Sequence, residues 1–280
     1  MSIRLVSALA SAIVLSVSTT AFADEYYSDN QTQASSRDDH WWSGDWYITL
    51  GAKGFVAPNY EGATDYKLRA APVISMGRPG SSLKFSSLND NASIGFIDTG
   101  VFRAGVTGKL ITGRDSSDYD ELKGLNDVDW GVELGGFAEF YPTENVRGRV
   151  EVRRGIGAHD GVVADFAIDA FTNLTDTVRV SAGPRATVAT KDYFREYYGV
   201  NASESAASGL KQYSPGGGLN SLGIGGQITW QTTDKITTSA FAEYNRLMGP
   251  AADSSLVKER GSPNQATFGL QATYRFDFSL

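Results

Sequence analysis

Cysteine is absent from this 280-residue chain, and histidine (two residues) and proline (eight) are scarce. Without cysteine there are no disulfide bonds and no thiolate metal sites. The formal net charge is −7 and the sequence has no basic cluster, which excludes nucleic acid as an expected partner. After residue 17, no stretch approaches the roughly 20 apolar residues that a membrane-spanning helix needs.

The first residues have the pattern of an export signal. Arg4 supplies a positive start, residues 5–17 form a short apolar core, and Ala21-Phe22-Ala23 matches a cleavage pattern. The core is too short to cross a bilayer as a helix. We therefore predict a signal peptide over residues 1–23, cleaved before Asp24.

After residue 23, the main pattern in the sequence is the alternation of polar or charged side chains with apolar or small ones. In residues 146–155, VRGRVEVRRG, charged residues alternate with apolar or small ones. A strand points successive side chains to opposite faces, so this pattern predicts a strand with one charged and one apolar face. The C-terminal residues 268–280 alternate without a break, which is longer than a common globular strand of about 5–6 residues. That length suits a tilted membrane strand.

The same reading applied to the whole chain predicts strands at 46–56, 66–77, 81–87, 91–97, 101–111, 129–140, 145–154, 162–171, 177–189, 221–232, 236–247 and 266–280. The longest connections, 112–128, 190–220 and 248–265, all fall at one end, and short turns fall at the other. Outer-membrane barrels have this asymmetry, with short turns on the periplasmic side. We predict an all-β fold: a transmembrane, antiparallel, up-and-down β-barrel over residues 46–280. Twelve strands are expected, and the short 88–90 connection leaves ten open.

The energetic cost of placing a charge in lipid decides which face of each strand points into the lumen. Each arginine turned towards the middle of the bilayer costs roughly 2–4 kcal/mol, so the charged face belongs in the lumen. Adjacent strands then alternate in charge, and we expect Glu139 opposite Arg147 and Glu133 opposite Arg153. This ladder has either a structural or a channel-lining role. Its predicted members are Glu133, Glu139, Arg147, Arg149, Glu151, Arg153, Asp165, Asp169, Arg179 and Arg185.

Several stretches resemble the MipA/OmpV family of outer-membrane proteins, the MltA-interacting protein and its relatives. They are GAKGFVAPNYEGATDYKLRAAPVISM (51–76), with its Pro-x-Tyr-Glu-Gly turn, YYGVNASESAASGL (197–210), NRLMGPAADSSLV (245–257) and GSPNQATFGLQATYRF (261–276). The resemblance implies a non-enzymatic barrel in the cell outer membrane. It also implies a scaffold that joins a periplasmic murein hydrolase to a murein synthase. A narrow channel for small solutes and a surface adhesin are the alternatives.

Two further segments invite functional hypotheses. Residues 24–45 are polar and acidic, and we expect a flexible periplasmic tail in which Trp41 and Trp42 are candidate anchors for a partner. The 190–220 connection is too long for a passive link, and its Ala/Ser run favours a short helix. It is expected to constrict the barrel mouth or to present an adhesive surface.

A barrel phospholipase is the enzymatic alternative. It requires a serine within reach of His159, which lies beside Asp160 in a predicted outer loop. No serine adjoins His159 in sequence, and one histidine with one aspartate falls short of a metal-ligand set. We therefore predict no enzymatic activity, no metal and no cofactor.

Overall fold

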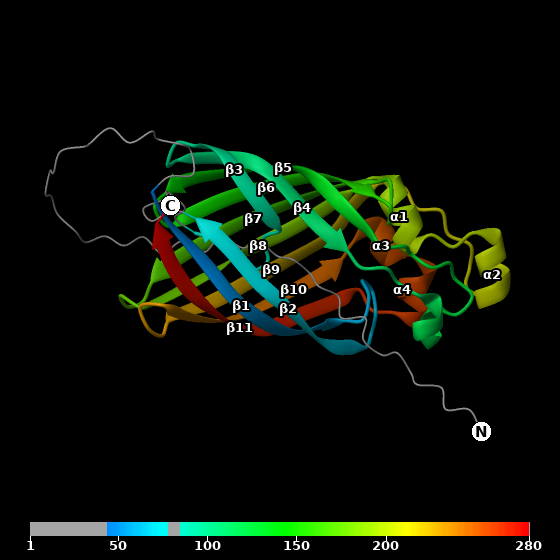
Figure 1. The fold of residues 1–280 in the computed structure, drawn as a ribbon. Coiled ribbons are helices and arrows are strands. Elements are labelled where there is room, and N and C mark those ends of the chain that lie inside the picture. Colours follow the sequence, from blue (N-terminus) through cyan, green and yellow to red (C-terminus); the bar gives the residue numbers. More distant parts are fainter. Residues whose placement is uncertain (1–43, 78–84, 280) are drawn as a thin grey trace, which may run out of the picture.

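The computed structural model describes residues 44–77 and 85–279. Within them, eleven strands form one antiparallel sheet that curves into a barrel, in the order β2-β1-β11-β10-β9-β8-β7-β6-β5-β4-β3 (Figure 1). The strands are β1 (Asp45–Pro58), β2 (Tyr66–Gly77), β3 (Ala92–Asp98), β4 (Phe102–Ile111), β5 (Gly131–Thr143), β6 (Val146–Ile156), β7 (Val162–Asn173), β8 (Val178–Ala189), β9 (Gly218–Gln231), β10 (Ile236–Leu247) and β11 (Asn264–Ser279).

Side chains alternate between the two faces of this sheet as the sequence pattern predicted. On β6, Val150 and Val152 are exposed on the outside, whereas Arg149 and Arg153 are buried inside. The exposed outer positions of the other strands are also large and apolar, and include Leu68, Leu134, Phe166, Ile224 and Leu270. Such a belt of apolar side chains on the outside is what lipid requires of a membrane barrel.

Of the twelve predicted strands, eleven are present among the described residues. Residues 85–87 of the predicted strand 81–87 are not in a strand, and residues 81–84 lie outside the described residues. Because neighbouring strands alternate in direction, the two edge strands of an eleven-stranded sheet, β2 and β3, run the same way. They cannot close the ring by antiparallel pairing with each other. Residues 85–91, which precede β3, lie inside the barrel, where Leu88 bonds to Gln227 of β9 and Asp90 bonds to Arg147 of β6.

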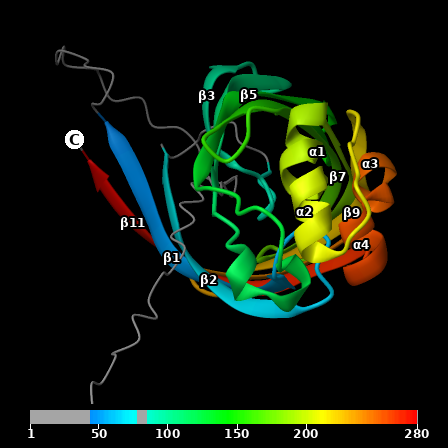
Figure 2. The same cartoon turned by 90° about the vertical axis from the view of Figure 1, so that its right-hand side faces the viewer.

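The two ends of the barrel differ. Four connections, 99–101, 144–145, 174–177 and 232–235, are short and lie at the end where β1 begins and β11 finishes. The opposite end carries the helices α1 (Lys191–Tyr198), α2 (Ala202–Ser208), α3 (Gly249–Asp253) and α4 (Ser255–Arg260) and the 3-10 turns η1 (Ser116–Asp118) and η2 (Asp120–Leu122) (Figures 1 and 2). By analogy with outer-membrane barrels, the short turns face the periplasm. No helix among the described residues is both long and apolar enough to span a membrane.

The helical end is a packed structure, which we call the cap. One apolar cluster joins α1 to α3 and α4 through Phe194, Tyr198, Leu247, Ala251 and Val257. A second cluster joins the 112–130 connection to the 199–210 region. The helix expected from the Ala/Ser run is α2, and its start carries a complete capping box of Asn201 and Glu204.

Candidate functional site

Three arginines of β6, Arg147, Arg149 and Arg153, lie at the centre of a buried network of ion pairs inside the barrel. Each of them contacts at least two carboxylates, so the buried charges are compensated as their burial requires. The pairs are Arg147 with Asp90, Glu139 and Asp169; Arg149 with Glu139 and Glu151; and Arg153 with Glu133, Glu151 and Asp165. We call this set, with Arg185, the luminal network.

Both predicted side-chain pairs are in contact, but the predicted backbone register was wrong. Arg147 lies 3.2 Å from Glu139, and Arg153 lies 2.8 Å from Glu133. In the backbone, however, Glu139 is paired with Arg149, and Glu133 with Gly155. The β5–β6 ladder has an irregularity between Phe140 and Thr143, which a regular hairpin would lack. The contacts survive because long arginine side chains reach diagonal neighbours across the strands.

The remaining predicted members lie on β7 and β8. Asp169 contacts Arg185 as well as Arg147, and Asp165 accepts a hydrogen bond from Thr187. Arg185 extends the network to within 4.0 Å of Glu243 on β10. Arg179 lies nearer the periplasmic end, where it donates to Asn173 and stacks over the Phe171 ring.

Residues 85–91, which we call the inserted segment, are held inside the barrel by side chains of β6, β7, β9 and β10. Gln227 of β9 accepts from the Leu88 amide at 2.8 Å and donates to the Ser86 carbonyl at 3.1 Å. The Phe85 ring stacks on Phe171 of β7, with 4.6 Å between ring centroids. Further side-chain contacts are Asn89 with Glu243 of β10 and Asn91 with Glu151 of β6.

Asp90 is the network residue that sequence reasoning missed. It receives two hydrogen bonds from the Arg147 guanidinium, at 2.5 and 2.9 Å, in a bidentate pair. The alternating sequence of residues 81–87 is typical of a wall strand. Nothing in the local pattern distinguishes a segment that crosses the lumen, so no sequence feature pointed to Asp90.

His159 links the luminal network to the cap. Its Nδ1 accepts from the Gly161 amide, so Nε2 carries the proton and donates to Glu133, 3.1 Å away. Its ring packs edge-on against Tyr193 and Tyr197 of α1. Both ring nitrogens are therefore hydrogen-bonded to Glu133 and to the Gly161 amide. The hydrolase alternative required a serine hydroxyl at one of them. Among the described residues no group of three or more acidic or histidine side chains is placed to hold a metal ion.

The Pro-x-Tyr-Glu-Gly turn between β1 and β2 fastens the cap to the barrel. Glu61 accepts from the Tyr193 hydroxyl and from the Asn220 amide, both at 2.6 Å. Burial, followed by the nearby Glu61 carboxylate, raises the pKa of Tyr193 well above its ordinary value. Gly62 has a φ of +96° and donates its amide to Gln265. This one turn thus bonds to α1 and to the first residues of β9 and β11.

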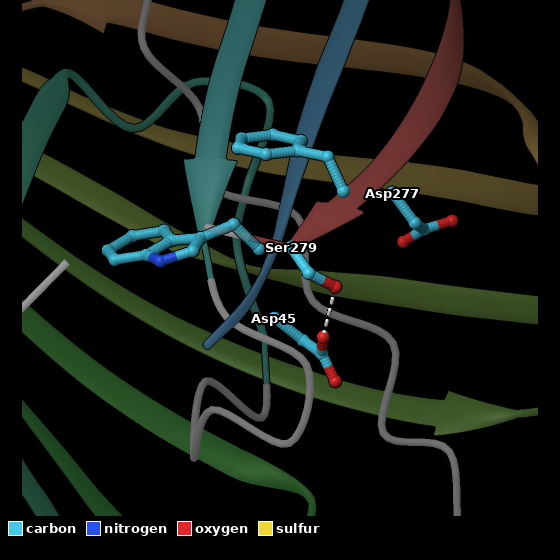
Figure 3. Close-up of a pocket in the computed structure, with 5 residues that line it drawn as sticks. Asp45, Asp277 and Ser279 are labelled. Atoms are coloured by element: carbon cyan, nitrogen blue, oxygen red, sulfur yellow. Dashed lines mark hydrogen bonds between the residues drawn. The ribbon is translucent and has the colours of Figure 1, made fainter. Parts of the chain in front are cut away.

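The periplasmic end carries a ring of exposed carboxylates, one at each short turn and two at the strand ends. We call it the acidic rim; it consists of Asp45, Asp98, Glu144, Asp176, Asp234 and Asp277. An open hollow lies where β1 begins and β11 finishes, lined by Asp45, Trp46, Asp277, Phe278 and Ser279 (Figure 3). There the Ser279 hydroxyl donates to Asp45 at 2.6 Å (Figure 3).

The predicted anchors Trp41 and Trp42, and the predicted signal peptide, lie outside the described residues. The described chain begins at Gly44, immediately before the strand that contributes Asp45 and Trp46 to the hollow.

The chain is similar to several solved outer-membrane proteins at low identity. A bacterial polysaccharide outer membrane secretin matches with 9% identity and a TM-score of 0.42, covering 82% of this chain and 98% of that one. The CymD monoaromatic hydrocarbon channel matches with 10% identity and a TM-score of 0.37, covering 85% and 90%. Neisserial surface protein A matches with 9% identity and a TM-score of 0.27, covering 82% and 97%.

No curated protein matches this sequence. The family model of the MltA-interacting protein MipA matches residues 50–276, which include every strand of the sheet at least in part. This chain, an outer-membrane β-barrel, therefore belongs to the MltA-interacting protein MipA family.

Proposed function

We propose that this protein is a non-conducting outer-membrane barrel that acts as a scaffold for periplasmic murein-remodelling enzymes, a hydrolase and a synthase. The family name, MltA-interacting protein, supports an interaction role. The observation that carries the proposal is the inserted segment, which lies in the lumen and bonds to side chains of β6, β9 and β10. A barrel filled in this way has its ends, and not its interior, available for function.

The lumen offers solutes no uncharged, empty path along β6. Arg147 and Arg153 are buried, and each is fixed by three carboxylates. Passage would require these buried pairs to separate, and a charge left unpaired in such a site costs several kcal/mol. We therefore favour the scaffold over a narrow solute channel.

The acidic rim is the surface on which we place the partner. Its six carboxylates are exposed. Of the described cations near them, Lys235 is exposed, whereas Arg103, Arg179 and Arg275 are half-buried, and Arg275 is paired with Asp277 at 2.7 Å. The short turns are too small to form a shaped binding surface, so charge has to supply much of the attraction. A partner with a basic face fits this rim, and added salt should weaken the complex.

The test is capture of a purified lytic transglycosylase and a purified murein synthase by the full-length barrel in detergent. We expect retention at low salt. A rim variant, Asp98→Asn, Glu144→Gln, Asp176→Asn and Asp234→Asn, should lose at least tenfold in affinity. A matched control, Asp65→Asn, Asp118→Asn, Asp129→Asn and Asp160→Asn, removes the same charge from the cap end and should bind normally.

The outcomes separate the two parts of the proposal. Failure of the wild-type barrel to retain either enzyme would overturn the scaffold role. Equal binding by the rim variant and the control would leave the scaffold role intact but move the docking surface away from the rim. Discrete conductance of the wild-type barrel in planar bilayers would instead support the channel alternative.

A further inference from the structure

Two arginines break the apolar outer face of the barrel. Among the described strand residues, the outward-facing positions carry only two charged side chains, Arg154 on β6 and Arg246 on β10, and both are exposed. No outward-facing position of these strands carries an acid. Both arginines lie at the helical end, Arg154 two residues before β6 ends at Ile156 and Arg246 one residue before β10 ends at Leu247.

Arg154 lies among apolar side chains. Its cross-strand partners are Leu134 on β5 and Val162 on β7, and its neighbours on the same face of β6 are Val152 and Ile156. Leu134, Val152 and Ile156 are exposed, as lipid-facing residues are. Arg154 has no ion pair or hydrogen bond from its side chain within residues 44–77 and 85–279, so its guanidinium has five unused donors.

Arg246 also lacks a carboxylate partner in the described part of the chain. It donates to the Asn264 side-chain oxygen at 2.9 Å, an oxygen that also accepts from Tyr244 at 2.7 Å. A neutral amide oxygen leaves the positive charge uncompensated and most of the guanidinium donors unused.

The aromatic residues nearby place both arginines at the edge of the lipid. The exposed Trp130 lies just before β5 at the same end, and the exposed Tyr244 lies two residues from Arg246 on the same face. Tryptophan and tyrosine gather at the level of lipid headgroups. An arginine at that level is tolerated, since its charge can reach anionic headgroups.

A third cation, Lys191, lies at the same end of the barrel, across β7 from Arg154. Lys191, the first residue of α1, is exposed and follows Thr190, whose amide and hydroxyl are both bonded to Val162, the cross-strand partner of Arg154. The neighbouring acid, Asp192, is already paired with Arg195 at 3.1 Å.

We propose that Arg154, assisted by Lys191, and Arg246 form two binding sites for phosphate groups of lipids in the outer leaflet. Phosphate matches the geometry of a guanidinium, which donates two parallel hydrogen bonds to it. Headgroup phosphates are anions available at this level, and the described residues offer the two arginines no carboxylate there. The sites are independent of the scaffold function, because they lie at the opposite end from the acidic rim.

The experiment counts bound lipid on the folded full-length barrel in detergent, by native mass spectrometry, during titration with diphosphorylated lipid A. We expect two preferred bound lipids on the wild type. Each of Arg154→Gln and Arg246→Gln should weaken one of them by about tenfold, the effect of losing one charge-assisted contact. Arg154→Lys should recover part of the loss, because charge is kept and bidentate geometry is not.

The controls separate phosphate recognition from general effects. Arg195→Gln also removes one positive charge, but from α1 in the cap, where Arg195 is paired with Asp192. This variant should leave lipid binding unchanged. Equal binding of dephosphorylated lipid A, or wild-type binding by the Arg154→Gln, Arg246→Gln double variant, would overturn the proposal. Displacement of lipid by millimolar inorganic phosphate would also overturn it, because the site would then be one for free phosphate.

Discussion

Asp90 and Arg147 form a bidentate ion pair inside the barrel, with oxygen–nitrogen distances of 2.5 and 2.9 Å. The two residues are 57 positions apart in sequence and belong to the inserted segment and to β6. Arg147 is fully buried, so this pair both fixes the segment in the lumen and neutralises part of the network.

Loosening the inserted segment should open the barrel. Asp90→Ala with Gln227→Ala removes the ion pair and the two backbone contacts of Gln227, while Glu139 and Asp169 still compensate Arg147. In planar bilayers we expect small discrete conductance steps from this double variant and none from the wild type. Asp98→Ala, in the exposed turn after β3, is the control. A double variant as silent as the wild type would show that the segment does not block the lumen.

Removing Arg147 should cost far more than removing one of its partners. Arg147→Met leaves Asp90, Glu139 and Asp169 close together without their shared cation, and the loss should be about 3–5 kcal/mol. Urea unfolding, followed by the gel shift between folded and unfolded barrel, measures it. Combining Arg147→Met with Asp90→Asn and Asp169→Asn should restore most of the stability. A combined variant less stable than Arg147→Met alone would contradict this account of the network.

The turn at Gly62 should not tolerate a side chain. Gly62 has a φ of +96°, and a Cβ there would lie 3.0 Å from Cγ2 of Val257. Gly62→Ala should therefore destabilise the cap by about 1 kcal/mol or more, through backbone strain and crowding. Faster proteolysis within residues 190–217 is the measurement. Gly54→Ala on β1, where a Cβ meets nothing within 4 Å, should leave proteolysis unchanged. Equal rates for both variants would contradict the fastening role of the turn.

Alkali should release the cap from the barrel. Burial raises the pKa of Tyr60 to about 12 and that of Tyr193 well above its ordinary value. The folded cap therefore holds these protons more tightly than the unfolded chain, whose tyrosine pKa is about 10. The contribution to stability is complete below about pH 10 and is lost as the pH rises towards the folded pKa values. Absorbance of tyrosinate and limited proteolysis, recorded together from pH 9 upwards, check this.

The matched variant for this titration is Tyr193→Phe. It removes one raised pKa and also the hydrogen bond to Glu61. We expect a cap that is weaker at neutral pH but less sensitive to alkali. A folded wild type in which every tyrosine titrates with the ordinary midpoint near pH 10 would contradict the buried environment of these hydroxyls.

The sequence alone determined which residues form strands and which face each side chain takes. Eleven of the twelve predicted segments are strands, and Arg147, Arg149 and Arg153 face inwards as expected. The reason is that a strand alternates with a fixed period and that lipid and lumen select opposite side chains at each step. Strand alternation and the choice between lipid and lumen both depend on local sequence, so neither requires knowing which distant residues are in contact.

The tertiary structure alone decided the strand count, the register of β5 with β6 and the path of residues 85–91. A bulge moved the register, and the side chains still met because arginine is long. The parity of the sheet left β2 and β3 running in the same direction, and residues 85–91 lie in the lumen, where Asp90 meets Arg147. Alternation describes the faces of a segment and is the same whether that segment lies in the wall or inside it.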